Sequence, residues 1–217
     1  MTTKSELRKA FKDGLISENK FKEELFKLEV MPKKKREKRH YEGVTEEEFK
    51  KILAQIKSKK IMIACYLAYG SGLRVEEIVN LQHDDIRLNR HSIFVRQGKG
   101  SKDRITNSPI GFKAEWLKYF PLGITKAAIE KAFHIASMKA NINRVIFSFK
   151  TRNGKTRNKY RLHFHCLRHS FGTRALENGV PINQVQVLLG HANVSTTNEY
   201  VKANPTSAIQ SIIDKGV

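Results

Sequence analysis

The sequence predicts a mainly α-helical fold that contains one small antiparallel β-sheet, an α+β class. Apolar residues recur at helical spacing along most of the chain, which indicates amphipathic helices. Residues 86–110 break this pattern with short strand-like runs around turns at Asn89-Arg90 and at 98–101. A chain of 217 residues can form one principal core and a small accessory piece.

The charge of the chain is strongly positive. Forty-one Lys and Arg residues against 21 acidic residues give a formal net charge of +20. This excess predicts a polyanionic partner, and nucleic acid is favoured over a membrane. The sequence contains no apolar run of about 18 residues, no signal-peptide pattern and no lipidation motif. We therefore expect a soluble, intracellular protein that works in the cytoplasm on nucleic acid.

Composition divides the chain into three parts. Residues 1–31 show helical spacing on both sides of an Asp13-Gly14 turn, which predicts a short helical hairpin. Residues 32–40 hold six basic residues and one acidic residue, so we expect a basic linker. This linker is either a flexible tether or a strap along phosphates. Residues 41–217 have the pattern of a packed domain with a C-terminal helix.

The first half of that domain is predicted to begin with three helices. Thr45 is followed by three acidic residues, which is typical of a helix N-terminus. Residues 60–69 form an apolar run that we expect to be a helix closed by Gly70 and Gly72. A short amphipathic helix should follow near residues 75–81, before the strands begin.

The second half is predicted to return to helices. We expect a helix at 125–140, a strand at 144–149, and a basic, turn-rich stretch at 150–161. Three further helices are expected near 166–178, 182–189 and 197–213.

Residues suited to anion chemistry cluster near the C-terminal end. His165 and Arg168 are three positions apart, so on a helical turn they share one face and could contact one anion. Thr196 and Glu199 fit a capping box, which would place Tyr200 in the first turn of the last helix. The N-terminus of a helix favours a phosphate or a phenolate nearby.

Five motifs in order then carry a family resemblance: Gly72-Leu-Arg74-Val-Glu-Glu77, Gly98-Lys99-Gly-Ser-Lys102-Asp-Arg104, His165-Cys-Leu-Arg168-His169, Leu188-Leu-Gly-His191, and Tyr200. They resemble the successive motifs of the tyrosine recombinase, or phage integrase, family across roughly residues 41–205. The resemblance implies a tyrosine-recombinase-like catalytic domain. It also implies an enzyme that cleaves and rejoins duplex DNA without a metal, another cofactor or ATP.

The resemblance further implies a catalytic set: Arg74, Lys99, His165, Arg168, His191 and Tyr200. Arg74 and Arg168 would clamp the non-bridging phosphate oxygens, because planar guanidiniums match phosphate and can replace a metal. Lys99 would protonate the leaving 5′ oxygen. Lys102 is an alternative for this role, but the lysine of the family follows the first glycine of the hairpin tip.

Tyr200 would be the nucleophile and would form a 3′-phosphotyrosyl link that stores the bond energy for rejoining. His165 would help to deprotonate it, and His191 would donate a hydrogen bond to the phosphoryl group. Glu77 either supports the site from behind or is an exposed helix acid. His169 is expected to pack or bond near Arg168.

A metal site is the main chemical alternative, formed by four residues within seven positions: His163, His165, Cys166 and His169. The glutamate that usually accompanies such histidines in hydrolases is missing there. Asp84 and Asp85 alone do not supply the carboxylates of a two-metal nuclease. The sequence therefore disfavours metal-dependent chemistry.

Two other functions remain open. A type IB topoisomerase uses a similar constellation, although His165 favours a recombinase, and a non-catalytic basic protein would only coat or bend DNA. A homo-oligomer, a tetramer on DNA, is expected. The apolar tail at 209–213 docks either on a neighbour or on its own domain. About 40 residues precede the catalytic pattern, which indicates a minimal recombinase or a fragment without the usual N-terminal clamping domain. Basic residues carry no information on the target sequence.

Overall fold

The computed structural model describes residues 3–30, 43–98, 102–151, 153–190 and 205–217. Two compact units are present, Met1–His40 and Tyr41–Val217. None of the helices within the described ranges combines the length and the apolar character needed to cross a membrane.

The first unit is a helical hairpin of α1 (Lys4–Lys12) and α2 (Glu18–Val30). Thr3 and Glu6 form a capping box that satisfies free backbone N–H groups at the start of α1. The rings of Phe11 and Phe21 stack with centroids 4.7 Å apart and join the two helices.

The second unit opens with three helices: α3 (Glu46–Ala54), α4 (Lys59–Ser71) and α5 (Val75–Asn80). Thr45 precedes the predicted helix and forms a capping box with Glu48. Helix α4 is largely buried and supplies the centre of the core. It ends at Gly72, whose φ of 64° lies in the left-handed region, so Gly70 belongs to the helix and does not close it.

A three-stranded antiparallel sheet follows, in the order β1 (Ile86–Arg87), β2 (Ser92–Gly98) and β3 (Lys102–Asn107). Short 3₁₀ turns, η1 (His83–Asp85) and η2 (Leu88–Arg90), flank β1. Val95 of β2 is buried and pairs with Arg104 of β3, so both side chains belong to the face that looks into the domain. This sheet confirms the strands predicted at 86–110.

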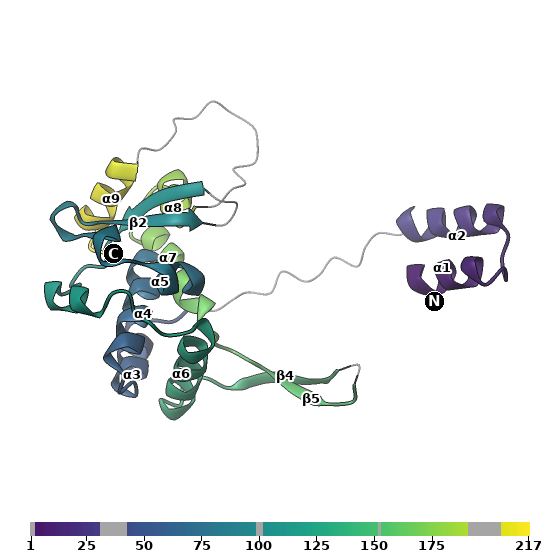
Figure 1. Ribbon diagram of the computed structural model, residues 1–217, viewed down its shortest axis with the longest axis horizontal. Coiled ribbons are helices and arrows are strands. Elements are labelled where there is room, and N and C mark those ends of the chain that lie inside the picture. Colours follow the sequence, from purple (N-terminus) through teal and green to yellow (C-terminus); the bar gives the residue numbers. More distant parts are fainter. Residues whose placement is uncertain (1–2, 31–42, 99–101, 152, 191–204) are drawn as a thin grey trace. The chain divides into compact units, whose positions relative to one another are not determined.

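A second antiparallel sheet shows that the prediction of one sheet was wrong. After η3 (Ala114–Tyr119) and α6 (Lys126–Lys139), strand β4 (Val145–Lys150) pairs with β5 (Thr156–Tyr160). Strand β4 confirms the strand predicted at 144–149, whereas β5 lies in the stretch at 150–161 that was predicted to be basic and turn-rich. The Thr-Arg-Asn-Lys-Tyr sequence of β5 has no apolar alternation that would indicate a strand. Figure 1 shows this ribbon projecting from the domain beside α6.

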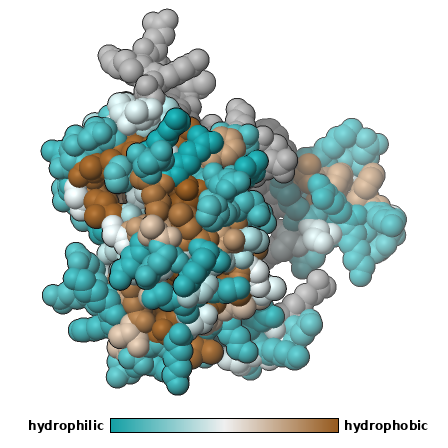
Figure 2. Space-filling view, turned by 60° about the vertical axis from the view of Figure 1, so that its left-hand side comes forward, coloured by the Kyte–Doolittle hydropathy of each residue, from teal (hydrophilic) through white to brown (hydrophobic). Residues whose placement is uncertain are grey.

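Three helices complete the domain: α7 (His165–Glu177), α8 (Ile182–Leu189) and α9 (Pro205–Asp214). The larger hydrophobic cluster extends from Val44 to Leu167, and a second begins at Phe171 and includes α8 and α9. Ile209 and Ile212 are buried, so the described part of the tail packs on its own domain. Hydrophilic side chains cover most of the face in Figure 2, with apolar patches between them. The predicted class, mainly helical with antiparallel β structure, is confirmed, and the structure has two small sheets within the described residues.

Candidate functional site

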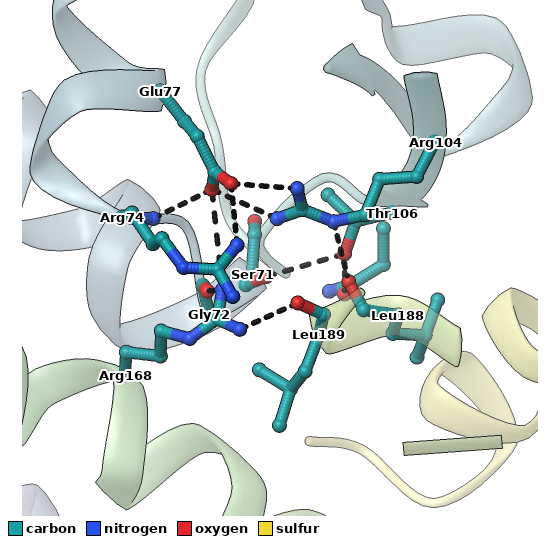
Figure 3. Close-up of polar contacts among 10 residues, drawn as sticks. Ser71, Gly72, Arg74, Glu77, Arg104, Thr106, Arg168, Leu188 and Leu189 are labelled. Atoms are coloured by element: carbon teal, nitrogen blue, oxygen red, sulfur yellow. Dashed lines mark hydrogen bonds and ion pairs between the residues drawn. The ribbon is translucent and has the colours of Figure 1, made fainter. Parts of the chain in front are cut away.

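The carboxylate of Glu77, in the first turn of α5, lies at the centre of a cluster of arginines (Figure 3). Its side chain is 6% exposed. Arg104 donates from Nη1 to Oε1 at 2.7 Å and from Nη2 to Oε2 at 2.8 Å. Arg74 donates from Nη1 to Oε1 and from its backbone N–H to Oε2, both at 2.7 Å. The expectation of an exposed helix acid is therefore wrong, and the expectation that Glu77 supports the site stays a prediction.

Arg168 completes the cluster from α7 and is almost fully buried. Its Nη1 donates to the carbonyl of Gly72 at 2.6 Å, and its Nη2 donates to the carbonyl of Leu189. Nη1 also lies 3.9 Å from Oε2 of Glu77. One guanidinium therefore joins the end of α4 to the end of α8.

The four side chains carry a net charge of +2, from three guanidiniums and one carboxylate. Burial alone would raise the pKa of Glu77, but the hydrogen bonds and charges of Arg104 and Arg74 lower it to about 2. Burial, together with the charges of Arg74 and Arg104, lowers the pKa of Arg168 to about 9, which leaves it protonated at pH 7. A buried cluster with excess positive charge is suited to bind an anion.

The end of α8 is held by the same arginines. Nε of Arg104 donates to the carbonyl of Leu188 at 3.1 Å, next to the Leu189 carbonyl that Arg168 binds. The last carbonyls of a helix have no partner within it, and cations stabilise them. Gly190 follows with a φ of +63°, and a Cβ there would lie 2.6 Å from Cδ of Arg104. Glycine at this position therefore permits the close approach of β3 to α8.

His165 is the first residue of α7, one turn before Arg168. Its ring is perpendicular to that of His169, with centroids 4.8 Å apart. Partial desolvation, followed by the nearby positive charges of His169 and Arg168, lowers the pKa of His165 to about 4. The imidazole is therefore neutral at pH 7 and can accept a proton.

The histidines around it do not form a metal site. Nδ1 of His163 lies 2.8 Å from Sγ of Cys166, and Cys166 is buried. Within the described part of the chain, no group of three or more His, Cys, Asp or Glu side chains is placed to hold a metal ion.

The structure thus brings Arg74 and Arg168 together and places His165 on the same helix as Arg168. The other three members of the predicted set, Lys99, His191 and Tyr200, lie outside the described residues. Arg104 stood in a motif but was given no role from the sequence. The alternation of inward-facing residues along β2 and β3 could have indicated it, because its partner Val95 is clearly a core residue.

Comparison with known proteins identifies the family of the chain. The family model described as "Phage integrase family" matches residues 42–207. Tyrosine recombinase XerA of Thermococcus onnurineus is 37% identical over 166 residues, which cover 74% of this chain and 57% of the relative. The crystal structure of XerA recombinase has a TM-score of 0.51 at 26% identity, covering 80% of this chain and 65% of that one. A lambda integrase dimer bound to a COC′ core site shares the fold, with a TM-score of 0.56 at 19% identity, covering 93% of this chain and 74% of that one.

This chain spans just over half the length of the curated relatives that it matches. With its motifs in the family's order and its arginines gathered around Glu77, the chain belongs to the phage integrase family of tyrosine recombinases.

Proposed function

We propose that this chain is a site-specific recombinase, or integrase, that cleaves and rejoins duplex DNA through a 3′-phosphotyrosyl intermediate. The observation that carries the proposal is the partly buried cluster of Arg74, Arg104 and Arg168 around Glu77, in a member of this family. A phosphodiester under attack gains negative charge, and fixed guanidiniums in a desolvated site stabilise that charge. Metal ions and ATP have no step in this scheme.

The different exposure of the arginines suggests a different role for each. The side chain of Arg74 is 20% exposed and that of Arg168 is 4% exposed, so Arg74 is the more accessible to a phosphate. Arg74 would bind a non-bridging oxygen directly. Arg168 would contribute its positive charge and its free N–H groups from the buried side of the cluster. Arg104 and Glu77 would hold Arg74 and Arg168 in position.

The chemical step would use the residues proposed from the sequence. The phenol oxygen of Tyr200 would bond to phosphorus while the bond from phosphorus to the 5′ oxygen breaks. His165 would accept the phenolic proton, and the ammonium of Lys99 would give a proton to the leaving 5′ oxygen. His191 would donate a hydrogen bond to a phosphoryl oxygen. Attack by a 5′-OH from another strand would reverse these transfers and release Tyr200.

Duplex DNA is the proposed substrate, and the net charge of +20 agrees with a polyanion. Exchange between two duplexes requires four strand cuts, and each cut needs its own tyrosine. We therefore propose a homotetramer on DNA. Such a reaction would take place on intracellular DNA, in the cytoplasm.

Covalent trapping on nicked duplexes tests this function. The wild-type chain should form a protein–DNA adduct that survives denaturation, whereas Tyr200→Phe should bind DNA and form none. Tyr119→Phe, at a half-buried tyrosine of η3, is the matched control and should form the adduct normally. An adduct that persists in Tyr200→Phe contradicts the assignment of the nucleophile. DNA binding by the wild-type chain without any adduct would indicate a non-catalytic DNA-binding protein.

A further inference from the structure

The β4–β5 ribbon exposes apolar side chains to solvent along its length. Every residue of β4 is exposed, and β5 is exposed or half-buried. Ile146 is 57% exposed, Phe149 is 45% exposed and Phe147 is 39% exposed. Several exposed apolar side chains on one projecting element mark an interaction surface, because each costs free energy while it faces water.

The strand register places aromatic rings and cations on one face of this ribbon. Phe147 pairs with Lys159 and Phe149 pairs with Arg157, and residues directly opposite in an antiparallel pair share a face. Nζ of Lys159 lies 5.6 Å from the centroid of the Phe147 ring. This face therefore alternates rings with positive charges.

The charge of the ribbon indicates the kind of partner. Residues 144–161 contain seven Lys or Arg residues and no Asp or Glu. Arg161 pairs with Glu48 of α3 at 2.8 Å, and the other six charges, with no acidic residue among them in the sequence, would oppose the close approach of a second copy of this ribbon. They complement a polyanion, and aromatic rings beside them suit contact with sugars and bases.

The dimensions of the ribbon match a groove of duplex DNA. Six residues of β4 span about 20 Å at roughly 3.3 Å per residue. The major groove accepts a two-stranded ribbon, and about 20 Å corresponds to about six base pairs.

The base of the ribbon is continuous with the candidate site. A cleft of about 420 Å³ lies between them, and Lys159 and Tyr160 of β5 line it together with His163 and His165. Glu130 and His134 of α6 also line this cleft, so it joins the base of the ribbon to His165 along one side of α6.

We propose that the β4–β5 ribbon is a second DNA-contacting surface, which lies in the major groove beside the phosphate that is cleaved. Lys150, Arg157 and Lys159 bind phosphates, and Phe147 and Phe149 pack against sugars and base edges. The proposal rests on the proposed function in one respect, that the chain binds duplex DNA.

The salt dependence of binding tests the charges. The probe is a fluorescent random-sequence duplex, and the Tyr200→Phe background prevents covalent trapping. Each lost phosphate contact reduces the magnitude of the slope of log K against log salt concentration by about 0.9. The triple variant Lys150→Gln/Arg157→Gln/Lys159→Gln should therefore have a slope that is smaller in magnitude by about 2.7. The matched control replaces three exposed lysines on other elements with Gln: Lys51, Lys57 and Lys113. Its slope should stay close to that of the parent, and equal slopes for the two triple variants would overturn the proposal.

The aromatic contacts are tested separately with Phe147→Ser/Phe149→Ser. This variant should bind the duplex at least ten-fold more weakly with an unchanged salt slope, because rings contribute no counterion release. Sedimentation of the DNA-free protein tests the competing explanation, a contact between protein copies. If the double variant changes the oligomeric state and leaves DNA affinity as it was, the ribbon is a contact between protein copies and the proposal is wrong.

Crosslinking then tests the position of the ribbon. Both native cysteines, Cys65 and Cys166, are buried, so a new surface cysteine can be labelled selectively with a photo-crosslinker. Thr156→Cys should crosslink to the duplex, and Lys51→Cys on α3 should not. Failure of Thr156→Cys to crosslink, while the wild-type chain forms the phosphotyrosyl adduct, would contradict the proposed role of the ribbon and leave the proposed function unaffected. Crosslinking of Thr156→Cys, without any adduct from the wild-type chain, would support the ribbon and contradict the proposed function.

Discussion

Arg104 and Glu77 meet in a two-point ion pair, with both guanidinium Nη atoms within 2.8 Å of the two carboxylate oxygens. The same carboxylate accepts two hydrogen bonds from Arg74 and lies 3.9 Å from Arg168. One acidic side chain thus orients two arginines and offsets part of the charge of a third. We expect both the stability of the fold and the proposed phosphate chemistry to depend on it.

Glu77→Gln should lower the free energy of unfolding by about 3 kcal/mol at pH 7, since it leaves buried guanidiniums without their counter-charge. Urea denaturation followed by circular dichroism measures this. Glu76→Gln is the matched control, because the neighbouring acid is exposed and pairs with the exposed Lys126. Its effect should stay below about 1 kcal/mol, and equal losses in the two variants would contradict the prediction.

The stabilisation from Glu77 should depend on pH. Its pKa in the folded chain is about 2, below the ordinary 4.5, so the carboxylate stabilises the fold above pH 4.5. That contribution is lost as the pH falls from about 4.5 towards 2. The difference in stability between wild type and Glu77→Gln should therefore narrow across this range. A constant difference from pH 7 down to pH 3 would show that the ionised carboxylate is not its source.

Arg168→Lys should slow adduct formation on a nicked duplex by about 100-fold, because an ammonium cannot bind the Gly72 and Leu189 carbonyls and still present charge to a phosphate. Arg174→Lys, on the same helix, is the control. Arg174 lies 3.9 Å over the ring of Tyr69 and should affect stability alone. Rates are compared per folded molecule in single-turnover assays. A comparable loss of rate in Arg174→Lys would mean that α7 packing, and not the Arg168 contacts, limits the reaction.

Protonation of His165 should set the low-pH limit of the rate of adduct formation. Its pKa of about 4 predicts that kcat/KM for adduct formation falls only as the pH approaches 4. His169→Gln removes a positive neighbour, so the pKa of His165 should rise and the limit should move to higher pH. His165→Gln should abolish the limit. The proposed proton transfer is wrong if the acidic limb is the same in His165→Gln as in the wild type.

Gly72→Ala should destabilise the domain by more than about 2 kcal/mol. Gly72 and Gly216 have φ values of +64° and +66°, so alanine at either position bears a similar left-handed strain of about 1 kcal/mol. A Cβ at Gly72 would also lie 2.6 Å from side-chain atoms of Leu189 and Phe171, whereas the space at Gly216 is open. Thermal or urea unfolding of the pair isolates the packing effect. Equal losses would show that the backbone strain alone matters.

Local patterns made much of the fold predictable. The capping box at Thr45 and the helix near 125–140 depend on neighbours a few positions away, and both are present. The strand predicted at 144–149 is present as β4, but its pairing with β5 was missed, because β5 has no apolar alternation and neither face of the ribbon is buried. The absence of a buried face, which hid the ribbon in the sequence, is also what makes it available to a partner.

The site was only partly predictable. Arg74 and Arg168 could be proposed from their motifs, but the choice between a buried and an exposed Glu77 required tertiary structure. The role of Arg104 depends on a strand register and on the close approach that Gly190 permits, neither of which a linear motif encodes. Lys99, His191 and Tyr200 stay proposals from the sequence and the family.

Arg168 also occupies a boundary in the core. Leu167 belongs to the larger hydrophobic cluster and Phe171 to the smaller one, and the guanidinium between them binds one carbonyl from each side. Hydrogen bonds weaken steeply with distance, so a displacement of about 1 Å between the two clusters would detach one of these carbonyls. The two hydrogen bonds of this guanidinium therefore depend on how the two clusters pack against each other. Distant substitutions that loosen the smaller cluster should reach the phosphate chemistry through this one side chain.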